Sequence, residues 1–595
     1  MDQALSETSA QGGAESWFVK ARSTLADLMP ACGFGIFLAA VMFVISMSPS
    51  LLPRTWWWQG VASGILIEVG YGAGILIQWV VSHLWRAAGV KITAKKAWVK
   101  ASKWLFFAGV AAWALWMLVR SYRSNNTSAH IMGFAPMSFT DYLAASAVAF
   151  IIAAAIAGLA MLIVGLWRRI TKAIRRFMPI WAAGLIAAGL VVALVIFVVS
   201  DVLFERGMEY AYGAFATADQ SDEPGIEQPV EPERSGSNAS YEPWEAIGKQ
   251  GRRFVTQGPR KADIEQVTGR DAMEPIRLYA SLAEGRSLEE VAQVAVTELR
   301  RTNALDRSVL VIATTTGTGW VEEWAVQPVE YLTGGDCVTI ATQYSYVPSA
   351  VAFLREFSKP AEASRVLFDA IMEEVNKLPE DERPAVYLQG VSLGAFGSQS
   401  LFEDEEDVRE QIDGAVWAGT PGATPLWQSL TASRHLGSPE IAPVVNSARN
   451  TRFVTKPEDL DSDIYGREFP AWRFPRIAYM QHASDPVVWW DPAIISNVPD
   501  WLREPARADL NPDMQWTRMA TFIQLSVDLP VAGLASDGHG HTYHREFIPV
   551  WASVLGLIHE DPLAGENPYR NADSSWINDV SLSRISTAIA EDLYP

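Results

Sequence analysis

Cysteine is scarce in this chain, where Cys32 and Cys337 are the only two among 595 residues. Cys32 falls in an apolar stretch that we expect to lie in a membrane, so a disulfide between the two is not expected. The residues around each thiol do not distinguish it from an ordinary buried cysteine. The sequence therefore predicts a fold that is stabilised without disulfides.

Positive charge is also in short supply, with 48 Lys and Arg against 67 Asp and Glu and a net charge of −19. An acidic surface argues against nucleic acid as a partner. The charge is unevenly split, because residues 1–200 hold 16 basic and 6 acidic residues, whereas the remainder holds 32 and 61. A basic, apolar first third joined to an acidic remainder indicates a membrane anchor that carries a water-facing domain.

The chain does contain long apolar runs, each long enough to cross a bilayer. The first is not a cleavable signal peptide, because it lacks a small-x-small cleavage site followed by polar sequence and further spans follow it. The chain is therefore predicted to be a multi-pass protein of the cell inner (plasma) membrane. The five predicted spans run roughly over residues 30–48, 57–82, 103–119, 142–167 and 178–203.

Basic loops predict the orientation of these spans. Loops 83–103 and 168–176 are rich in Lys and Arg and belong on the cytoplasmic side by the positive-inside rule, whereas loop 120–141 is mostly neutral. Five spans then put everything after about residue 204 on the extracytoplasmic side. A miscount of one span would reverse this prediction.

Few polar residues interrupt the spans. Glu68 lies in the middle of one, where a carboxylate is either functional or packed inside the bundle, and both interpretations stay open. The pairs Gly60/Gly64 and Gly70/Gly74 favour close packing of helices. The spans carry no chain of acidic or histidine residues, so a pump or proton channel is poorly supported.

The chain is predicted to have three parts. Residues 1–210 form a transmembrane helical domain, and residues 211–243 form an acidic, Pro-rich linker that has too few large apolar residues to bury a core. Residues 244–595 form a globular domain. An insertion around residues 423–475, with Trp427 and Trp472, either covers an active site or is an inert surface excursion.

The globular domain alternates strand-like and helix-like segments, which implies a mostly parallel sheet with helices on both faces. Helices are expected over residues 361–378 and 547–558, and the apolar stretch 521–534 is expected to supply the last strand. The other predicted strands cover residues 308–313, 338–341, 385–389, 412–418 and 477–482.

The most informative motif is Gly390-Val391-Ser392-Leu393-Gly394, between a predicted strand and a predicted helix. A nucleophile on a tight strand-to-helix turn has a strained backbone, so the residues two before and two after it must be small. The N–H of Leu393 would donate to an oxyanion. A second donor is expected from the turn after strand 308–313, where Thr315, Thr316 and Gly317 are candidates.

An acid and a base follow Ser392 in the chain order that an α/β-hydrolase requires. Asp485 follows a predicted strand, and His539 and His541 follow later; we favour His541 as the base because it lies nearer the closing helix. Asp485 could alternatively be a helix N-cap before Pro486. His482 is expected to be a buried, hydrogen-bonded residue.

No cofactor or metal is predicted. His539, His541 and His544 could suggest zinc, but neither a cysteine nor a carboxylate stands at a familiar ligand spacing near them. Ser392, Asp485 and a histidine instead predict nucleophilic catalysis through an acyl-enzyme.

Several segments resemble a bacterial, largely actinobacterial, family of membrane-anchored α/β-hydrolases with a multi-span N-terminal domain. The resemblance implies an α/β-hydrolase fold and a catalytic triad of Ser392, Asp485 and a histidine of the last matching motif. Val391 departs from the pattern, where a polar residue such as Glu is expected. The matching segments are residues 244–255, 315–320, 343–349, 390–397, 481–490 and 538–541.

We therefore expect an α-helical transmembrane bundle followed by an α/β-hydrolase domain that acts on an ester of a lipid or cell-envelope conjugate. Tethering to a bilayer favours lipidic substrates by proximity. An acyltransferase with the same triad is one alternative, and a non-catalytic membrane binding or scaffold protein is another. The oligomeric state cannot be read from the sequence.

Overall fold

The computed structural model describes residues 33–87, 96–283, 285–349, 351–352, 356, 358–505, 508–558 and 562–594. The chain forms two compact units. The first, here called the helical unit, comprises residues 1–131, 135–208 and 515–527. The second, here called the α/β unit, comprises residues 132–134, 209–514 and 528–595.

The helical unit contains four helices that are long and apolar enough to cross a membrane, and these match the last four predicted spans. The described part of the first predicted span is the shorter helix α2, and residues 30–32 lie outside the described residues. Residues 88–95 of the basic loop 83–103 also lie outside them. The elements are α2 (Gly33–Ser46), α3 (Trp56–Ala87), α4 (Lys96–Ile131), α5 (Phe139–Ile174), α6 (Ile180–Phe197), a π-helical segment η1 (Val198–Glu205), α7 (Arg206–Asp219) and α19 (Arg518–Asp528).

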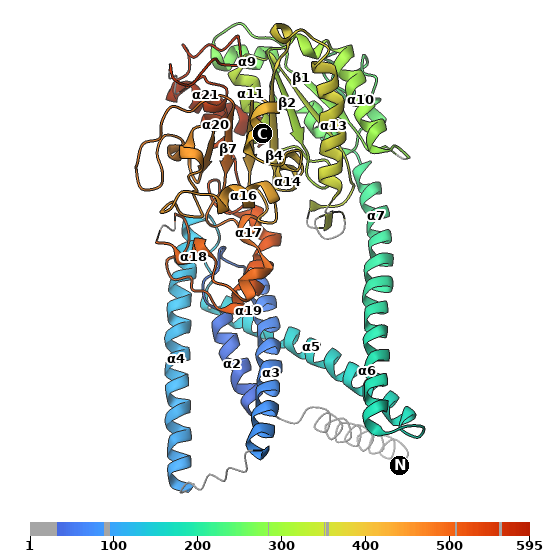
Figure 1. The fold of residues 1–595 in the computed structure, drawn as a ribbon, viewed down its shortest axis with the longest axis vertical. Helices are drawn as coiled ribbons and strands as arrows, with labels where there is room; N and C mark the ends of the chain where they lie inside the picture. Colours follow the sequence, from blue (N-terminus) through green and yellow to red (C-terminus); the bar gives the residue numbers. More distant parts are fainter. Residues whose placement is uncertain are drawn as a thin grey trace, which may run out of the picture. The chain divides into compact units, whose positions relative to one another are not determined.

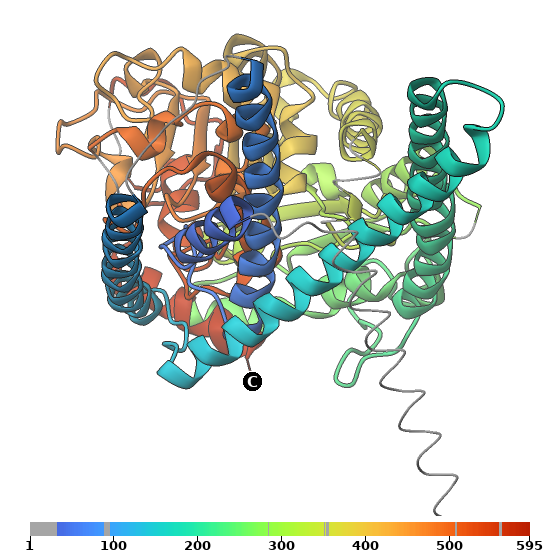
Figure 2. The same ribbon diagram turned by 90° about the horizontal axis from the view of Figure 1, so that it is seen from below.

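Glycines on α3 allow its two neighbours to approach closely. A Cβ added to Gly60 would lie 2.6 Å from the Val148 side chain of α5, and one added to Gly74 would lie 2.5 Å from the Gly35 Cα of α2. Larger residues would therefore push the helices apart. The cyan α5 crossing the blue α3 can be followed in Figure 2.

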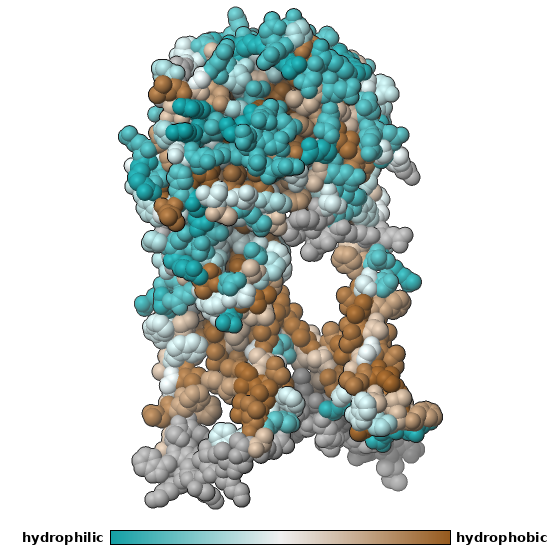
Figure 3. All heavy atoms as spheres, in the orientation of Figure 1, coloured by the Kyte–Doolittle hydropathy of each residue, from teal (hydrophilic) through white to brown (hydrophobic). Residues whose placement is uncertain are grey.

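The outer faces of these helices are apolar. Leu105, Leu162 and Trp181 are 78%, 73% and 70% exposed, and Figure 3 shows brown, apolar surface over the helical unit and mainly teal, polar surface over the α/β unit. Exposed apolar faces of this extent are typical of helices that contact lipid. The fold therefore fits a transmembrane bundle.

The α/β unit is built on a seven-stranded sheet in the order β1-β3-β2-β4-β5-β7-β6, in which every neighbouring pair is parallel. The five strands predicted from residue 308 to residue 482 are confirmed, and the parallel sheet is the predicted class (Figure 1). The strands are β1 (Ile276–Ala280), β2 (Val309–Thr314), β3 (Cys337–Thr342), β4 (Ala385–Val391), β5 (Gly414–Ala418), β6 (Thr451–Val454) and β7 (Arg476–Met480).

Two strands escaped prediction. β1 carries the fully buried Arg277, whose guanidinium bonds Glu323 at 3.0 Å and Glu330 at 2.7 Å. An arginine in a strand of five residues interrupts its apolar pattern. The carboxylates that neutralise Arg277 lie about 50 residues further along the chain, so the local sequence does not indicate that this charge is buried. β6 lies within the predicted insertion 423–475 and pairs with β7 at the edge of the sheet.

Helices form two layers against the sheet, visible in Figure 1. One layer contains α10 (Leu288–Arg301), α13 (Lys359–Val375) and α14 (Leu393–Gln399). The other contains α9 (Lys261–Thr268), α11 (Glu323–Leu332), α20 (Phe547–Val554) and α21 (Asp579–Leu593). The remaining helices are α8 (Lys249–Thr256), α15 (Glu405–Gln411), α16 (Pro425–Ala432), α17 (Pro486–Trp489) and α18 (Asp500–Arg503).

The segment predicted as a linker, residues 211–243, begins within a helix and then makes hydrogen bonds and ion pairs with the rest of the α/β unit. Helix α7 extends to Asp219, and the following residues pack onto the α/β unit. Arg234 is fully buried and donates to the carbonyls of Val255, Gln257 and Pro259. The acidic residues of this segment pair with arginines of and after α8, such as Arg260 with Glu231 at 2.7 Å. Composition predicted a solvated chain because these partners lie 20–30 residues downstream.

The prediction of a strand over residues 521–534 is wrong. The stretch folds as the end of α19 and a 3₁₀ helix, η8 (Leu529–Leu534). Its buried residues recur at helical spacing, with Thr521, Gln524 and Asp528 on one face. Residues 515–527 belong to the helical unit, so this part of the stretch does not extend the sheet.

Candidate active site

Ser392 stands directly after β4, the strand between β2 and β5. Its backbone has φ 56° and ψ −122°, a strained conformation for a non-glycine residue. A Cβ added to Gly390 would lie 2.5 Å from the carbonyl carbon of Gly394, and one added to Gly394 would lie 2.2 Å from the Thr314 carbonyl oxygen. The turn therefore requires both glycines of the motif.

Leu393 is the first residue of α14, so its N–H has no carbonyl acceptor within the helix. The Leu393 side chain is buried in a small cluster with Val347 and Ala352, and Tyr212 and Phe215 of α7 pack against that cluster. These contacts fix the backbone on which the predicted oxyanion donor lies.

The predicted second donor lies in the turn after β2, which the close approach of Gly394 to Thr314 places beside the serine turn. The Thr316 N–H donates to the Trp320 carbonyl at 3.1 Å, so Thr316 could donate to an oxyanion only through its hydroxyl. The Thr315 hydroxyl donates to the Thr342 carbonyl at 2.7 Å. Gly317 therefore fits the role of backbone donor better than Thr316.

Asp485 and His541 come together at the carboxyl ends of the central strands. His541 Nδ1 lies 2.7 Å from Asp485 Oδ2, and the Tyr543 hydroxyl donates to the same oxygen at 2.8 Å. Asp485 is fully buried and its other oxygen accepts the Val487 N–H at 2.8 Å. Asp485 is thus both the N-cap of α17, as the alternative interpretation held, and the partner of a histidine.

The other nitrogen of His541 is buried and has no hydrogen-bond partner among the described residues. The ring presses on Gly419, since a Cβ added there would lie 2.3 Å from His541 Cε1. The neighbouring Ala418 carbonyl accepts the Ser392 N–H at 3.0 Å. Ser392 therefore bonds Ala418, the last residue of β5, and the His541 ring lies beside the next residue, Gly419.

His539, the other candidate base, lies in a separate pair. Its Nδ1 lies 3.1 Å from Asp509 Oδ2, and the Ser484 hydroxyl donates to that carboxylate. Asp509 was not singled out by sequence reasoning. The structure thus brings His541, and not His539, to Asp485.

His482 is buried and hydrogen-bonded, as predicted. Its ring nitrogens lie 2.8 Å from the Gly540 carbonyl and 2.9 Å from Glu546 Oε2, and both atoms are acceptors. Burial alone would lower the pKa of His482, but the Glu546 carboxylate raises this pKa to about 9. The charged ring stacks on Tyr543 and holds the loop that carries His541.

Tyr543 is a further residue of this site whose role the sequence did not predict. Its hydroxyl accepts the backbone N–H of His482 at 3.1 Å and donates to the Asp485 carboxylate. Tyr543 thus links the backbone three residues before Asp485 to that carboxylate. A tyrosine two residues after a predicted catalytic histidine carries no recognisable motif, so the sequence offered no signal for it.

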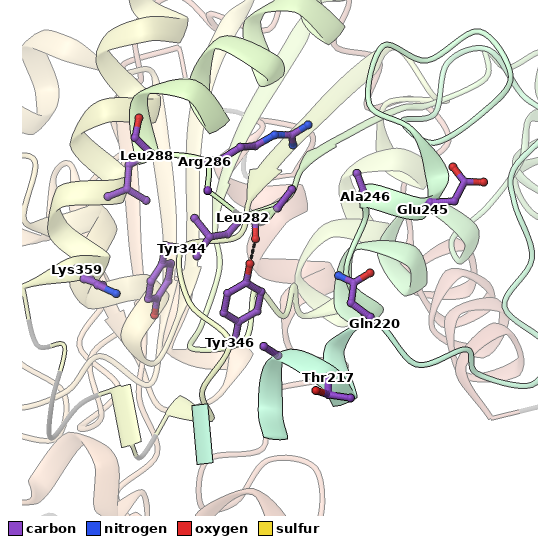
Figure 4. Close-up of a pocket in the computed structure, with 14 residues that line it drawn as sticks. Thr217, Gln220, Glu245, Ala246, Leu282, Arg286, Leu288, Tyr344, Tyr346 and Lys359 are labelled. Carbon is purple, nitrogen blue, oxygen red and sulfur yellow. Dashed lines mark hydrogen bonds between the residues drawn. The ribbon is translucent and has the colours of Figure 1, made fainter. Parts of the chain in front are cut away.

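A cavity of about 910 Å³ lies between the end of α7, the start of α10 and the segment after β3 (Figure 4). Tyr344 and Tyr346 line it, and the Tyr346 hydroxyl bonds the Leu282 carbonyl. None of the predicted catalytic residues lines it. The segment continues to Val347, whose carbonyl oxygen lies 2.5 Å from a Cβ built on Gly317, so one wall adjoins the predicted oxyanion turn.

Comparison with known proteins identifies relatives at the level of protein families. Residues 276–562 match a model described as the alpha/beta-hydrolase family. Residues 47–259 match a model described as the N-terminus of the same family. Searches of curated proteins and of solved structures found no match.

Proposed function

Since the two matched models together span most of residues 47–562, the chain belongs to the alpha/beta-hydrolase family, and we propose that it is a membrane-anchored serine hydrolase. The proposed triad is Ser392, His541 and Asp485. The observation that carries it is the 2.7 Å contact of His541 Nδ1 with buried Asp485, which leaves the buried Nε2 without a partner beside the strained serine turn.

The proposed reaction is acyl transfer from an ester. His541 Nε2 removes the proton of the Ser392 hydroxyl as the oxygen attacks the carbonyl, and the N–H groups of Leu393 and Gly317 stabilise the oxyanion. Collapse of the intermediate breaks the ester bond, and His541 returns the proton to the leaving alkoxide. Water, activated in the same way, then releases the acid from Ser392.

Asp485 orients the base in this mechanism. Because its Oδ2 accepts from His541, the Nδ1 of the ring keeps its proton and Nε2 is free to act as the base. Tyr543 fills another lone pair of the same oxygen, which keeps the buried carboxylate hydrogen-bonded and fixed.

We propose an ester of a lipid or cell-envelope conjugate as the substrate. Apolar helices that can cross a membrane support this choice, because they would tether the same chain to a lipid bilayer. The cavity beside Gly317 has a volume typical of small-molecule sites and would receive part of the substrate. Transfer of the acyl group to another hydroxyl instead of water is the alternative within the same chemistry.

The basic loops support placing the α/β unit on the extracytoplasmic side of an inner (plasma) membrane. The resemblance to bacterial, largely actinobacterial, membrane-anchored hydrolases agrees with that location. Comparing the lipids of a deletion strain with those of wild type would identify the substrate class.

Ser392→Ala tests the proposal most simply. The variant should fold normally and lose hydrolysis of a p-nitrophenyl ester. Ser400→Ala is the matched control, because its hydroxyl only donates to the Phe396 carbonyl at the other end of α14. Wild-type turnover by Ser392→Ala would refute the proposal, because hydrolysis would then not depend on Ser392, whereas a wild type without any turnover would favour a non-catalytic binding or scaffold role.

A further inference from the structure

Gly540, the residue before the proposed base, is held at both its N–H and its carbonyl. The N–H donates to the Ser484 hydroxyl oxygen at 2.8 Å, and His482 Nδ1 lies 2.8 Å from the carbonyl oxygen. His482 and Ser484 follow β7 and lead directly to Asp485. Within the α/β unit, the segment that carries the acid thus holds the segment that carries His541.

The loop before His541 contains two glycines whose order comes at an entropic cost. Gly538 and Gly540 have φ of 83° and 55°, in the left-handed region that glycine adopts without strain. Glycine also loses more conformational freedom on folding than any other residue. The two contacts of Gly540 offset this cost and fix the backbone next to the His541 ring.

The two ring nitrogens of His482 both face acceptors. Nδ1 faces the Gly540 carbonyl, and Nε2 lies 2.9 Å from the carboxylate oxygen Glu546 Oε2. A neutral imidazole carries one N–H, whereas the imidazolium carries two. Only the protonated ring of His482 can therefore make both contacts at once.

The surroundings of His482 favour this charged ring. Burial lowers the pKa of His482, but the carboxylates of Glu546 and Asp509 raise it, and it reaches about 9. Asp509 is also paired with His539, at 3.1 Å. The groups that lie around His482 are Glu546 from the segment before α20, Asp509 from the segment after α18, and Tyr543, whose ring stacks on the imidazole at a centroid distance of 4.1 Å.

Loss of one proton from His482 would break one of its two contacts. A hydrogen bond to a carboxylate is stronger than one to a carbonyl, so the remaining N–H would stay with Glu546. The lone pair of Nδ1 would then face the Gly540 carbonyl oxygen, and two acceptors at this distance repel each other. Gly540 should move away, and His541 should move with it.

We infer that His482 is a positioning residue, whose imidazolium holds Gly540 and with it the base His541 in the place that acylation of Ser392 requires. The inference rests on the proposed role of His541 as the base. Misplacement of a catalytic group by about 1 Å costs up to about a hundredfold in rate. Because the pKa of His482 lies above its ordinary value, the proton is present at neutral pH and is lost as the pH rises through about 9.

The test measures the pH dependence of ester hydrolysis by the full-length chain in detergent. The kcat and KM for a p-nitrophenyl ester are followed on both sides of the His482 pKa, and Ser392→Ala supplies the blank for spontaneous hydrolysis. Labelling of Ser392 by a fluorophosphonate at each pH gives a rate constant and a final amplitude. The rate constant reports the geometry of the site, whereas the amplitude reports the fraction of folded chains.

Glu546→Gln separates positioning from other effects of pH. Its amide can donate to His482 Nε2, so a neutral ring can keep its Nδ1 proton for the Gly540 carbonyl. Glu591→Gln is the matched control, because it makes the same exchange at an exposed position on α21.

The inference predicts that kcat and the labelling rate constant of the wild type and of Glu591→Gln fall about tenfold as the pH rises through 9. The amplitude and KM should stay near their neutral-pH values, and Glu546→Gln should show no such fall. A wild type without the fall, or a fall at the same pH in Glu546→Gln, would overturn the inference. So would an amplitude that falls at an unchanged rate constant, because His482 would then only stabilise the fold.

The two hypotheses can fail separately. If Ser392 of the wild type is labelled at a rate that stays constant through pH 9, positioning by His482 is refuted and the hydrolase survives. If Ser392→Ala is labelled as fast as the wild type, the proposed function itself fails. Should Glu546→Gln not fold, His482→Gln takes its place: it has no imidazole to titrate, so a fall in its rate near pH 9 would overturn the inference.

Discussion

Replacing Asp485 by asparagine probes the proposed mechanism in detail. Asp485 accepts three hydrogen bonds, from the Val487 N–H on Oδ1 and from His541 and Tyr543 on Oδ2. An asparagine has one oxygen and one NH₂ group, so one of the two positions must become a donor. Either the NH₂ group opposes the Val487 N–H, or it faces His541 Nδ1 and makes that nitrogen an acceptor.

The second arrangement moves the imidazole proton to Nε2, where it can no longer accept the proton of Ser392. We expect kcat to fall by about 10⁴, the loss known for a triad acid, which corresponds to about 5.4 kcal/mol of transition-state stabilisation. The assay is steady-state hydrolysis of a p-nitrophenyl ester by the full-length chain in detergent.

Asp509→Asn is the matched control, because Asp509 forms the neighbouring carboxylate–histidine pair with His539. This variant should change kcat by less than about tenfold. A loss below tenfold in Asp485→Asn, with Asp509→Asn as the more damaging change, would show that the wrong pair was assigned to catalysis.

Three further predictions concern the base, the neighbouring histidine and the orientation in the membrane. His541→Ala should abolish fluorophosphonate labelling whereas His539→Ala should only slow it, and the opposite ranking in labelling rates would reverse the assignment of the base. The pKa of His482 is lowered by burial but raised by Glu546 from 6.5 to about 9, so the stability that the His482–Glu546 pair contributes is complete below pH 6.5 and is lost as the pH rises through 9. The difference in Tm between wild type and Glu546→Gln should therefore shrink over that range, and a constant difference would contradict this prediction. Alkaline phosphatase fused after Asp222 should be active and a fluorescent protein that folds only in the cytosol should be dark, whereas the reverse pattern would put the α/β unit inside the cell.

Much of the α/β unit could be predicted because its features are local. The strand, turn and helix around Ser392 follow from apolar residues and two glycines within one short segment, and the order of Ser392, Asp485 and His541 is read directly along the chain. Buried parallel strands such as β2 and β4 are continuous apolar runs, which distinguish them from their surroundings.

The features that escaped prediction depend on distant partners. Arg277 is stable in β1 only because Glu323 and Glu330 surround it, and Arg234 fastens the expected linker through three carbonyls that follow it in the chain. Similarly, the stretch containing Gln524 is a helix because the helical unit supplies its partners, some 470 residues earlier in the sequence. Such tertiary contacts override local patterns.

The choice between His539 and His541 shows the same limit. Both histidines follow a glycine, and each has a carboxylate partner in the structure. Only the fold separates them, because His541 is the one whose ring meets Asp485 and lies beside Gly419. The sequence could name the pair but not the physical reason for preferring one.

The central claim is that Ser392 is a nucleophile, and mass spectrometry of the chain after reaction with a fluorophosphonate tests it most directly. We predict a single phosphonyl adduct on the peptide that contains Ser392, formed in step with the loss of esterase activity and absent from Ser392→Ala. An unmodified Ser392 after complete reaction, or an adduct on a different residue that accounts for the lost activity, would contradict the account.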